Sequence, residues 1–248
     1  DFKTYGVSNS QKEAFSATTT SNARTGSNSI NVTQIAQEQR SVSGAFASSS
    51  ASLNGGSAIT LSMVIGASST TTTNIVVNEP TLASTVTAIN NANLGVTAEI
   101  VDTGGNGDNY RIQLIGSTGA EKAFSLTSDE SSLSFSAVQS ASDANITLNG
   151  IDFTRSTNVI DDVLTGVTLT LNGTTSGAAS LAINQDNSEA RANIVDFVTI
   201  YNEAKRQLDE LSSSTVDGPL AGDSIFRSMT RQLRGVMLNT SSTPGTNI

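Results

Sequence analysis

Histidine, cysteine and tryptophan are absent from this chain of 248 residues. Without histidine, the chain cannot form a Ser-His-Asp triad or the commonest zinc and iron sites. Without cysteine, it has no disulfide bond, thiolate nucleophile or iron–sulfur cluster. We therefore expect a protein that is not an enzyme, with no catalytic residue, no cofactor and no metal site.

Basic and aromatic residues are scarce. The chain has 13 Lys and Arg against 22 Asp and Glu, a net charge of −9, and only 4% of its residues are aromatic. Nucleic acid and anionic membrane surfaces repel such a chain. Its longest nearly apolar run, from Ala58 to Ala67, is shorter than the roughly 20 residues that span a bilayer. We expect neither nucleic-acid binding nor membrane insertion.

Hydroxyl residues are abundant. The chain has 37 Ser and 32 Thr but only 3 Pro, a composition typical of exposed β structure and of a secreted protein. Because the chain opens with Asp1 and shows no signal-peptide pattern, we expect it to be a fragment of a longer protein.

Alternation of apolar and polar residues predicts strands over most of the first 185 residues. Residues 14–35 read as one hairpin, and residues 41–57 as a connector. After Thr81, which can cap a helix, the spacing of Leu82, Val86 and Ile89 predicts a short helix. Further strands are expected at 59–63, 75–77, 96–100, 110–114, 146–148 and 151–153. Residues 159–164 are expected to form a helical turn. Residues 167–171 and 181–183 are expected to form a hairpin.

These elements predict a mainly β fold with α: a discontinuous β domain with an inserted α+β domain, plus a C-terminal antiparallel helical pair. The first domain comprises 14–48 and 143–185. The insertion, 51–142, is acidic, mainly β and carries one short helix. The helical hairpin covers 187–240.

The last quarter of the chain has helical periodicity. Asp186 and Glu189 resemble a capping box. Apolar residues then repeat at heptad spacing and form a helical seam: Ala190, Ile194, Phe197, Tyr201, Ala204, Leu208 and Leu211. If this seam is buried, Phe197→Ala should cost about 3–5 kcal/mol.

A second helix is expected from Asp223, with Phe226, Met229, Leu233 and Val236 on its apolar side. It carries a stripe of arginines, which we call the arginine stripe: Arg227, Arg231 and Arg234. Two interpretations stay open. The stripe is either a solvated face that pairs with Asp209 or Glu210, or a subunit interface that contacts an acidic neighbour.

Two other patterns have simple explanations. Residues 104–109 resemble one copy of a calcium-binding glycine repeat, but a single copy favours a hairpin turn. The adjacent carboxylates 129–130, 161–162 and 209–210 point in different directions on a strand or helix. They do not show the facing carboxylates of a glycosidase.

Several motifs resemble the flagellar filament cap family, flagellar hook-associated protein 2 (FliD). The most specific is a turn that opens the second helix: Gly218, Pro219, Leu220, Ala221, Gly222, Asp223 and Ser224. Phe197-Val198 with Tyr201-Asn202 is similar to the preceding family helix. The blocks 143–169 and 29–37 resemble family strands, and 81–98 resembles a flagellin-type motif.

The resemblance implies an extracellular protein that caps the flagellar filament tip and promotes flagellin folding and polymerisation. Its expected partners are further copies of itself in an oligomeric ring, flagellin, hook–filament junction proteins and an export chaperone. Two alternatives remain: an adhesin-type module that binds glycan or a host surface, and an acid-pair hydrolase.

Overall fold

The computed structural model describes residues 4–105, 107–212, 228–229, 231–232 and 235. Residues 4–185 form one compact unit, and residues 186–212 belong to another. Among the described residues, no helix is both long and apolar enough to cross a membrane.

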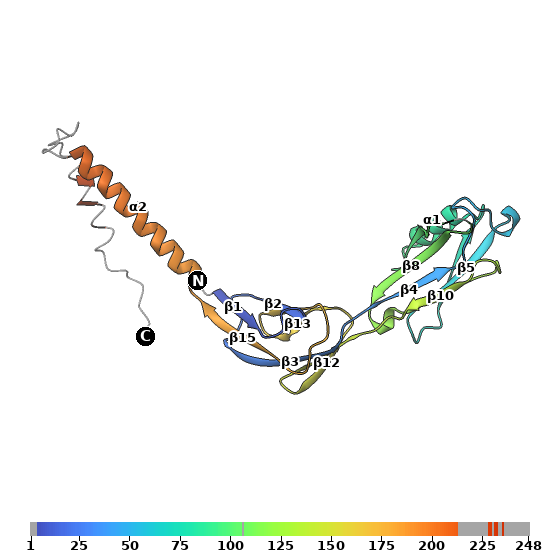
Figure 1. The fold of residues 1–248 in the computed structure, drawn as a ribbon, viewed down its shortest axis with the longest axis horizontal. Coiled ribbons are helices and arrows are strands. Elements are labelled where there is room, and N and C mark those ends of the chain that lie inside the picture. The colour runs from blue at the N-terminus through green and yellow to red at the C-terminus, as the bar shows by residue number, and fades with distance from the viewer. Residues whose placement is uncertain (1–3, 106, 213–227, 230, 233–234, 236–248) are drawn as a thin grey trace. The chain divides into compact units, whose positions relative to one another are not determined.

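The first group of strands forms two sheets around a shared core (Figure 1). The five-stranded sheet has the order β1 (Thr4–Asn9), β15 (Ala179–Asp186), β3 (Gly26–Gln34), β11 (Ala144–Leu148) and β12 (Ile151–Arg155). The three-stranded sheet has the order β13 (Val159–Leu164), β14 (Val167–Leu171) and β2 (Phe15–Thr19). Alternate side chains of both sheets, among them Phe15, Ile30 and Leu181, are fully buried between them.

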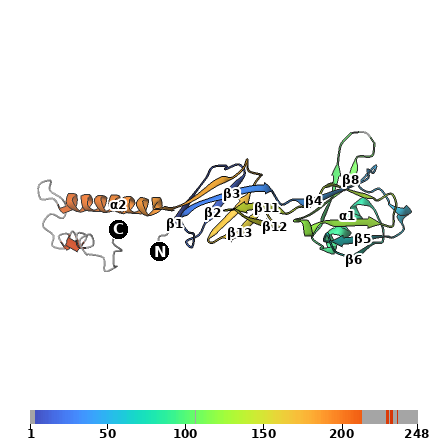
Figure 2. The same cartoon turned by 90° about the horizontal axis from the view of Figure 1, so that it is seen from below.

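The second group lies in the middle of the sequence and has its own core (Figure 2). One sheet has the order β10 (Phe135–Gln139), β4 (Glu38–Ser43), β8 (Tyr110–Thr118) and β7 (Thr97–Asp102). The other has the order β6 (Thr72–Val77), β5 (Ile59–Ile65) and β9 (Phe124–Ser128). Two short 3-10 turns, η1 (Asn54–Gly56) and η2 (Ala120–Lys122), belong to the same part of the chain.

Helix α1 (Leu82–Ala92) forms as its sequence predicts. The Thr81 hydroxyl accepts a hydrogen bond from the backbone N–H of Ser84, and the Ser84 hydroxyl accepts one from the N–H of Thr81. Leu82 and Ile89 are buried in the second core. Asn93, with φ of +53°, ends the helix in the left-handed conformation. The predicted fold class, mainly β with α, is confirmed.

Two predicted hairpins, at 14–35 and at 167–183, are wrong, although their strands exist. β2 pairs with β14 rather than β3, and β14 also pairs with β13. β3 pairs with β11 and β15. The segments after β2 and after β14 carry the chain from one sheet to the other, as is usual in a sandwich, so consecutive strands do not pair.

Residues 159–164 are a strand rather than a helical turn. Val159 pairs with Thr170 and Ile160 pairs with Leu169, which buries Ile160 in the first core. The β-branched pair therefore gains more from sheet packing than from a helical turn.

The expected connector begins inside strand β4. Ser41 and Ser43 are buried there, and the strand pairs with β8 and β10 of the second group. Our sequence-based division placed these residues with 14–48. The division into domains stays a prediction, and the pairing of β4 favours a first boundary near Gln37, where the chain pairs with Ser142.

Candidate assembly surface

Helix α2 (Ser188–Ser212) carries the residues of the predicted seam. It begins one residue later than the predicted capping box implies. The Asp186 carboxylate accepts a hydrogen bond from the Ser188 N–H at 2.9 Å. This bond lowers the pKa of Asp186 and stabilises the positive end of the helix.

The first half of α2 exposes large apolar side chains. Ile194 is 64% exposed, Phe197 50% and Ile200 68%, and Val195 and Val198 are exposed as well. Tyr201 and Leu208 are half-buried, and the side chain of Leu211 lies outside the described residues. Apolar residues at this density favour a surface that a partner covers in the assembled protein.

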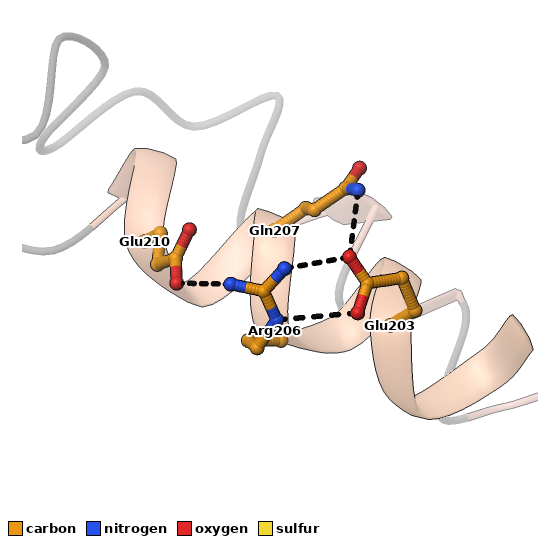
Figure 3. Close-up of polar contacts among 4 residues, drawn as sticks. All are labelled: Glu203, Arg206, Gln207 and Glu210. Atoms are coloured by element: carbon orange, nitrogen blue, oxygen red, sulfur yellow. Dashed lines mark hydrogen bonds and ion pairs between the residues drawn. The ribbon is translucent and has the colours of Figure 1, made fainter. Parts of the chain in front are cut away.

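Side chains of the second half of α2 form ion pairs with one another along the helix surface (Figure 3). The Arg206 guanidinium donates to both carboxylate oxygens of Glu203 and to Glu210, while Gln207 donates to Glu203. These bonds lower the pKa of Glu203 and raise the pKa of Arg206. All these side chains are exposed, so solvent screens each pair and its contribution to helix stability is small.

This network changes the interpretation of the acidic pair 209–210. Asp209 pairs with Lys205 at 2.8 Å, and Glu210 pairs with Arg206, both four residues away on the same helix. The carboxylates that one of the two interpretations paired with the arginine stripe therefore have partners within α2.

The family-like turn 218–224 lies outside the described residues, as do Arg227 and Arg234 of the arginine stripe. Arg231 is described and exposed. The roles of these residues stay predictions.

We call the first and second groups of strands the β lobes. Two asparagines of the family-like motifs form hydrogen bonds with backbone groups in these lobes. The Asn158 side chain donates to the carbonyl of Ala36 at 2.9 Å and accepts from its N–H at 2.7 Å. Asn90 binds both backbone groups of Ala98 in the same way, at 2.9 and 2.8 Å. Both asparagines belong to blocks that resemble the family, so these blocks specify the fold.

Two further residues of the family-like block 143–169 connect strands of the first group through side-chain contacts. Asn149, with φ of +51°, sits in the β11–β12 turn and accepts from the Ser29 N–H. Arg155 on β12 forms a bidentate pair with Asp162 on β13, which lowers the pKa of Asp162.

Sequence reasoning missed Gln39. Its buried side chain donates to the Phe124 carbonyl at 2.7 Å and accepts from the Phe124 N–H at 2.9 Å. The available signal was the alternation Gln39, Ser41, Ser43, which places polar residues on the inner face of a strand.

Both carboxylates of the adjacent pair 129–130 accept hydrogen bonds from backbone N–H groups. Asp129 accepts from the Thr60 N–H, and Glu130 accepts from the Ser132 N–H. Of three open hollows on the described surface, one is lined by a single carboxylate, Glu13, and another by a single carboxylate, Asp152. The third is lined by none. In the same residues, no cluster of three metal-ligating side chains occurs.

The segment 104–109 joins β7 and β8 as a hairpin loop, as predicted. Asp102 accepts from the Gly104 N–H, and the Asn109 side chain donates to the Gly105 carbonyl at 2.7 Å. These oxygens therefore bind within the loop.

The fold of this chain resembles that of known proteins. The closely resembling folds are those of flagellar cap proteins: the FliD D1-D2-D3 structure from Escherichia coli matches with a TM-score of 0.70 and 29% identity, over 98% of this chain and 71% of that one. The E. coli D2-D3 structure matches over its whole length and 75% of this chain, with a TM-score of 0.65 and 28% identity. The fold therefore places the chain among flagellar cap proteins.

The sequence agrees. Residues 141–248 match the family model of the flagellar hook-associated protein 2 C-terminus. Flagellar hook-associated protein 2 of E. coli O157:H7 is 32% identical over 94% of this chain. The chain belongs to the flagellar hook-associated protein 2 (FliD) family. It spans 56% of that relative's length, and 13% of the Helicobacter pylori relative's length is matched at 38% identity.

Proposed function

We propose that the protein containing this chain caps the distal end of the flagellar filament and promotes the folding and polymerisation of flagellin. The observation that carries the proposal is the match of 75% of this chain to the whole of a flagellar cap D2-D3 structure. On this proposal the protein is extracellular, at the filament tip, and acts as a structural assembly factor without catalysis. The comparisons lend no support to an adhesin or a hydrolase.

The proposed partners are further copies of the protein in a ring, flagellin, the hook–filament junction proteins and an export chaperone. A ring requires a heterologous contact, in which one surface of a subunit meets a different surface of the next. We propose the exposed apolar half of α2 and the arginine stripe as parts of such contacts. The net charge of −8 over residues 1–186 supports an acidic neighbour for the stripe.

Charge reversal tests this surface. Changing Arg227, Arg231 and Arg234 to Glu should abolish rings in negative-stain images and leave the circular dichroism spectrum unchanged. Three exposed cations of the β lobes without an ion pair serve as the matched control when changed to Glu: Lys12, Arg24 and Lys122. Normal rings in the stripe variant would rule out the stripe as an interface.

A further inference from the structure

Four asparagines of this chain are followed directly by glycine: Asn54, Asn106, Asn149 and Asn172. At such a pair the backbone nitrogen of the glycine can attack the side-chain amide of the asparagine, because glycine has no Cβ to crowd the five-membered ring that forms. In a folded protein the rate depends on whether the amide and the attacking nitrogen are held in place. Residue 106 lies outside the described residues, so three pairs are compared.

The Asn172-Gly173 pair is held through its backbone. The Gly173 N–H, which contains the attacking nitrogen, donates to the carbonyl of Ala14 at 2.9 Å. The Asn172 N–H donates to the same carbonyl at 2.8 Å. Attack requires the Gly173 N–H to leave this acceptor, so the hydrogen bond slows the reaction.

The Asn149-Gly150 pair is held through its side chain. The Oδ1 atom of Asn149 accepts from the Ser29 N–H at 2.9 Å, and its Nδ2 donates to Oδ1 of Asn28 at 3.0 Å. Both partners belong to strand β3, so the amide group is fixed against the sheet. These two bonds must break before the amide carbon can turn toward the Gly150 nitrogen, which slows the reaction here as well.

The Asn54-Gly55 pair has neither restraint. Asn54 and the residues that follow it as far as Ala58 are all exposed. Within the part of the chain that the structure describes, no acceptor binds the Gly55 N–H and no donor binds Oδ1 of Asn54. The Nδ2 atom of Asn54 donates to Ala58 at 3.2 Å and to Ser57 at 3.4 Å, at or beyond the long end of such bonds. Because both acceptors are carbonyls of the same short turn, they hold the amide less firmly than a strand does.

We propose that Asn54 is a site of spontaneous deamidation in the folded protein, and that it reacts faster than Asn149 or Asn172. The Gly55 nitrogen forms a bond with Cγ of Asn54, and the bond from Cγ to Nδ2 breaks. The proton of the Gly55 N–H passes through water to Nδ2, which leaves as ammonia. Water then opens the cyclic imide at one of its two carbonyl carbons. The product is aspartate, or isoaspartate, in which the backbone runs through the side chain.

The modification changes the segment around η1. No charged residue occurs from Ser41 to Asn78, so deamidation places a negative charge in an uncharged stretch. A carboxylate cannot donate to the carbonyls of Ser57 and Ala58, and its oxygens repel them. The Gly56 and Ser57 N–H groups, which are hydrogen-bonded within this turn, should therefore exchange faster with solvent in the deamidated chain.

Peptide mass spectrometry of the aged chain tests the site. The purified 248-residue chain is kept at mildly alkaline pH and then digested with pepsin in acid, where formation of the imide is slow. Fragment spectra give the fraction of each asparagine whose amide has become a carboxyl group. Asn54 should deamidate about tenfold or more faster than Asn149 or Asn172. The Asn54→Gly chain should lose the signal and keep its fold, because glycine suits the φ of +50° at this position.

Two controls separate the effect of the structure from that of the local sequence. In guanidinium chloride the three pairs lose their hydrogen bonds, so their rates should become similar. In the folded chain, Asn28→Ala removes the acceptor of the Asn149 amide, which should speed deamidation at Asn149 and leave the rate at Asn54 unchanged. Equal rates at the three sites of the folded chain, or a ranking that persists in the denaturant, would overturn the proposal, whether or not the protein caps filaments.

Discussion

Replacing Gln39 with methionine tests the claim that buried amide side chains hold the β lobes together. Methionine has nearly the shape of glutamine but makes neither of the two hydrogen bonds to Phe124, a residue that is only 6% exposed. Each buried backbone group left unpaired costs about 1–3 kcal/mol, and the thioether returns part of this through apolar burial. We expect the free energy of unfolding to fall by about 2–4 kcal/mol.

Urea unfolding followed by circular dichroism measures this loss, and amide exchange locates it. The Phe124 N–H should exchange faster in the Gln39→Met chain, whereas the core strand β8 stays protected. Gln113→Met is the control, since Gln113 is half-buried on β8 and its side chain makes no hydrogen bond in the structure. Equal destabilisation by the two variants would refute the reasoning.

Three further predictions concern other parts of the chain. Thr85→Val should raise stability by about 1 kcal/mol in thermal unfolding, because the fully buried Thr85 hydroxyl has no hydrogen-bond partner. Phe197→Ala should lower it by less than about 1.5 kcal/mol rather than the 3–5 expected for a buried seam, since Phe197 is half-exposed. The pKa of Asp162 is lowered by Arg155, so their pair stabilises the fold above the ordinary aspartate pKa and this contribution disappears as the pH falls through the lowered value. Asp162→Asn should therefore flatten the acid limb of the stability curve, and an unchanged acid limb would contradict it.

Local signals were sufficient for most of the single elements. The cap at Thr81 and the helical spacing after it predict α1 within a few residues, because the capping residue and the apolar spacing are both local features of the sequence. Period-two alternation located most strands, including β5, β11 and β14. Fold class followed from these elements.

The pairing partners of the strands could not be predicted from the sequence. β2 and β3 are close in the chain, but each satisfies its apolar face by joining a different sheet of the sandwich. Such long-range partners depend on the whole core, and a polar loop between two strands does not distinguish a hairpin from a crossover.

The candidate surface was predicted in part. The heptad spacing identified the apolar residues of α2, but it could not show that Ile194 and Phe197 stay exposed. It also gave no sign that Asp209 and Glu210 pair within the helix, because i to i+4 partners compete with any partner on a second helix.

Complementation of a cap-deficient bacterium tests the central proposal most directly. The gene that encodes this chain, expressed in a strain without its own filament cap protein, should restore long filaments and swimming. Cells that still release flagellin monomers into the medium and stay non-motile, although the protein is exported and folded, would contradict the assignment to the filament cap.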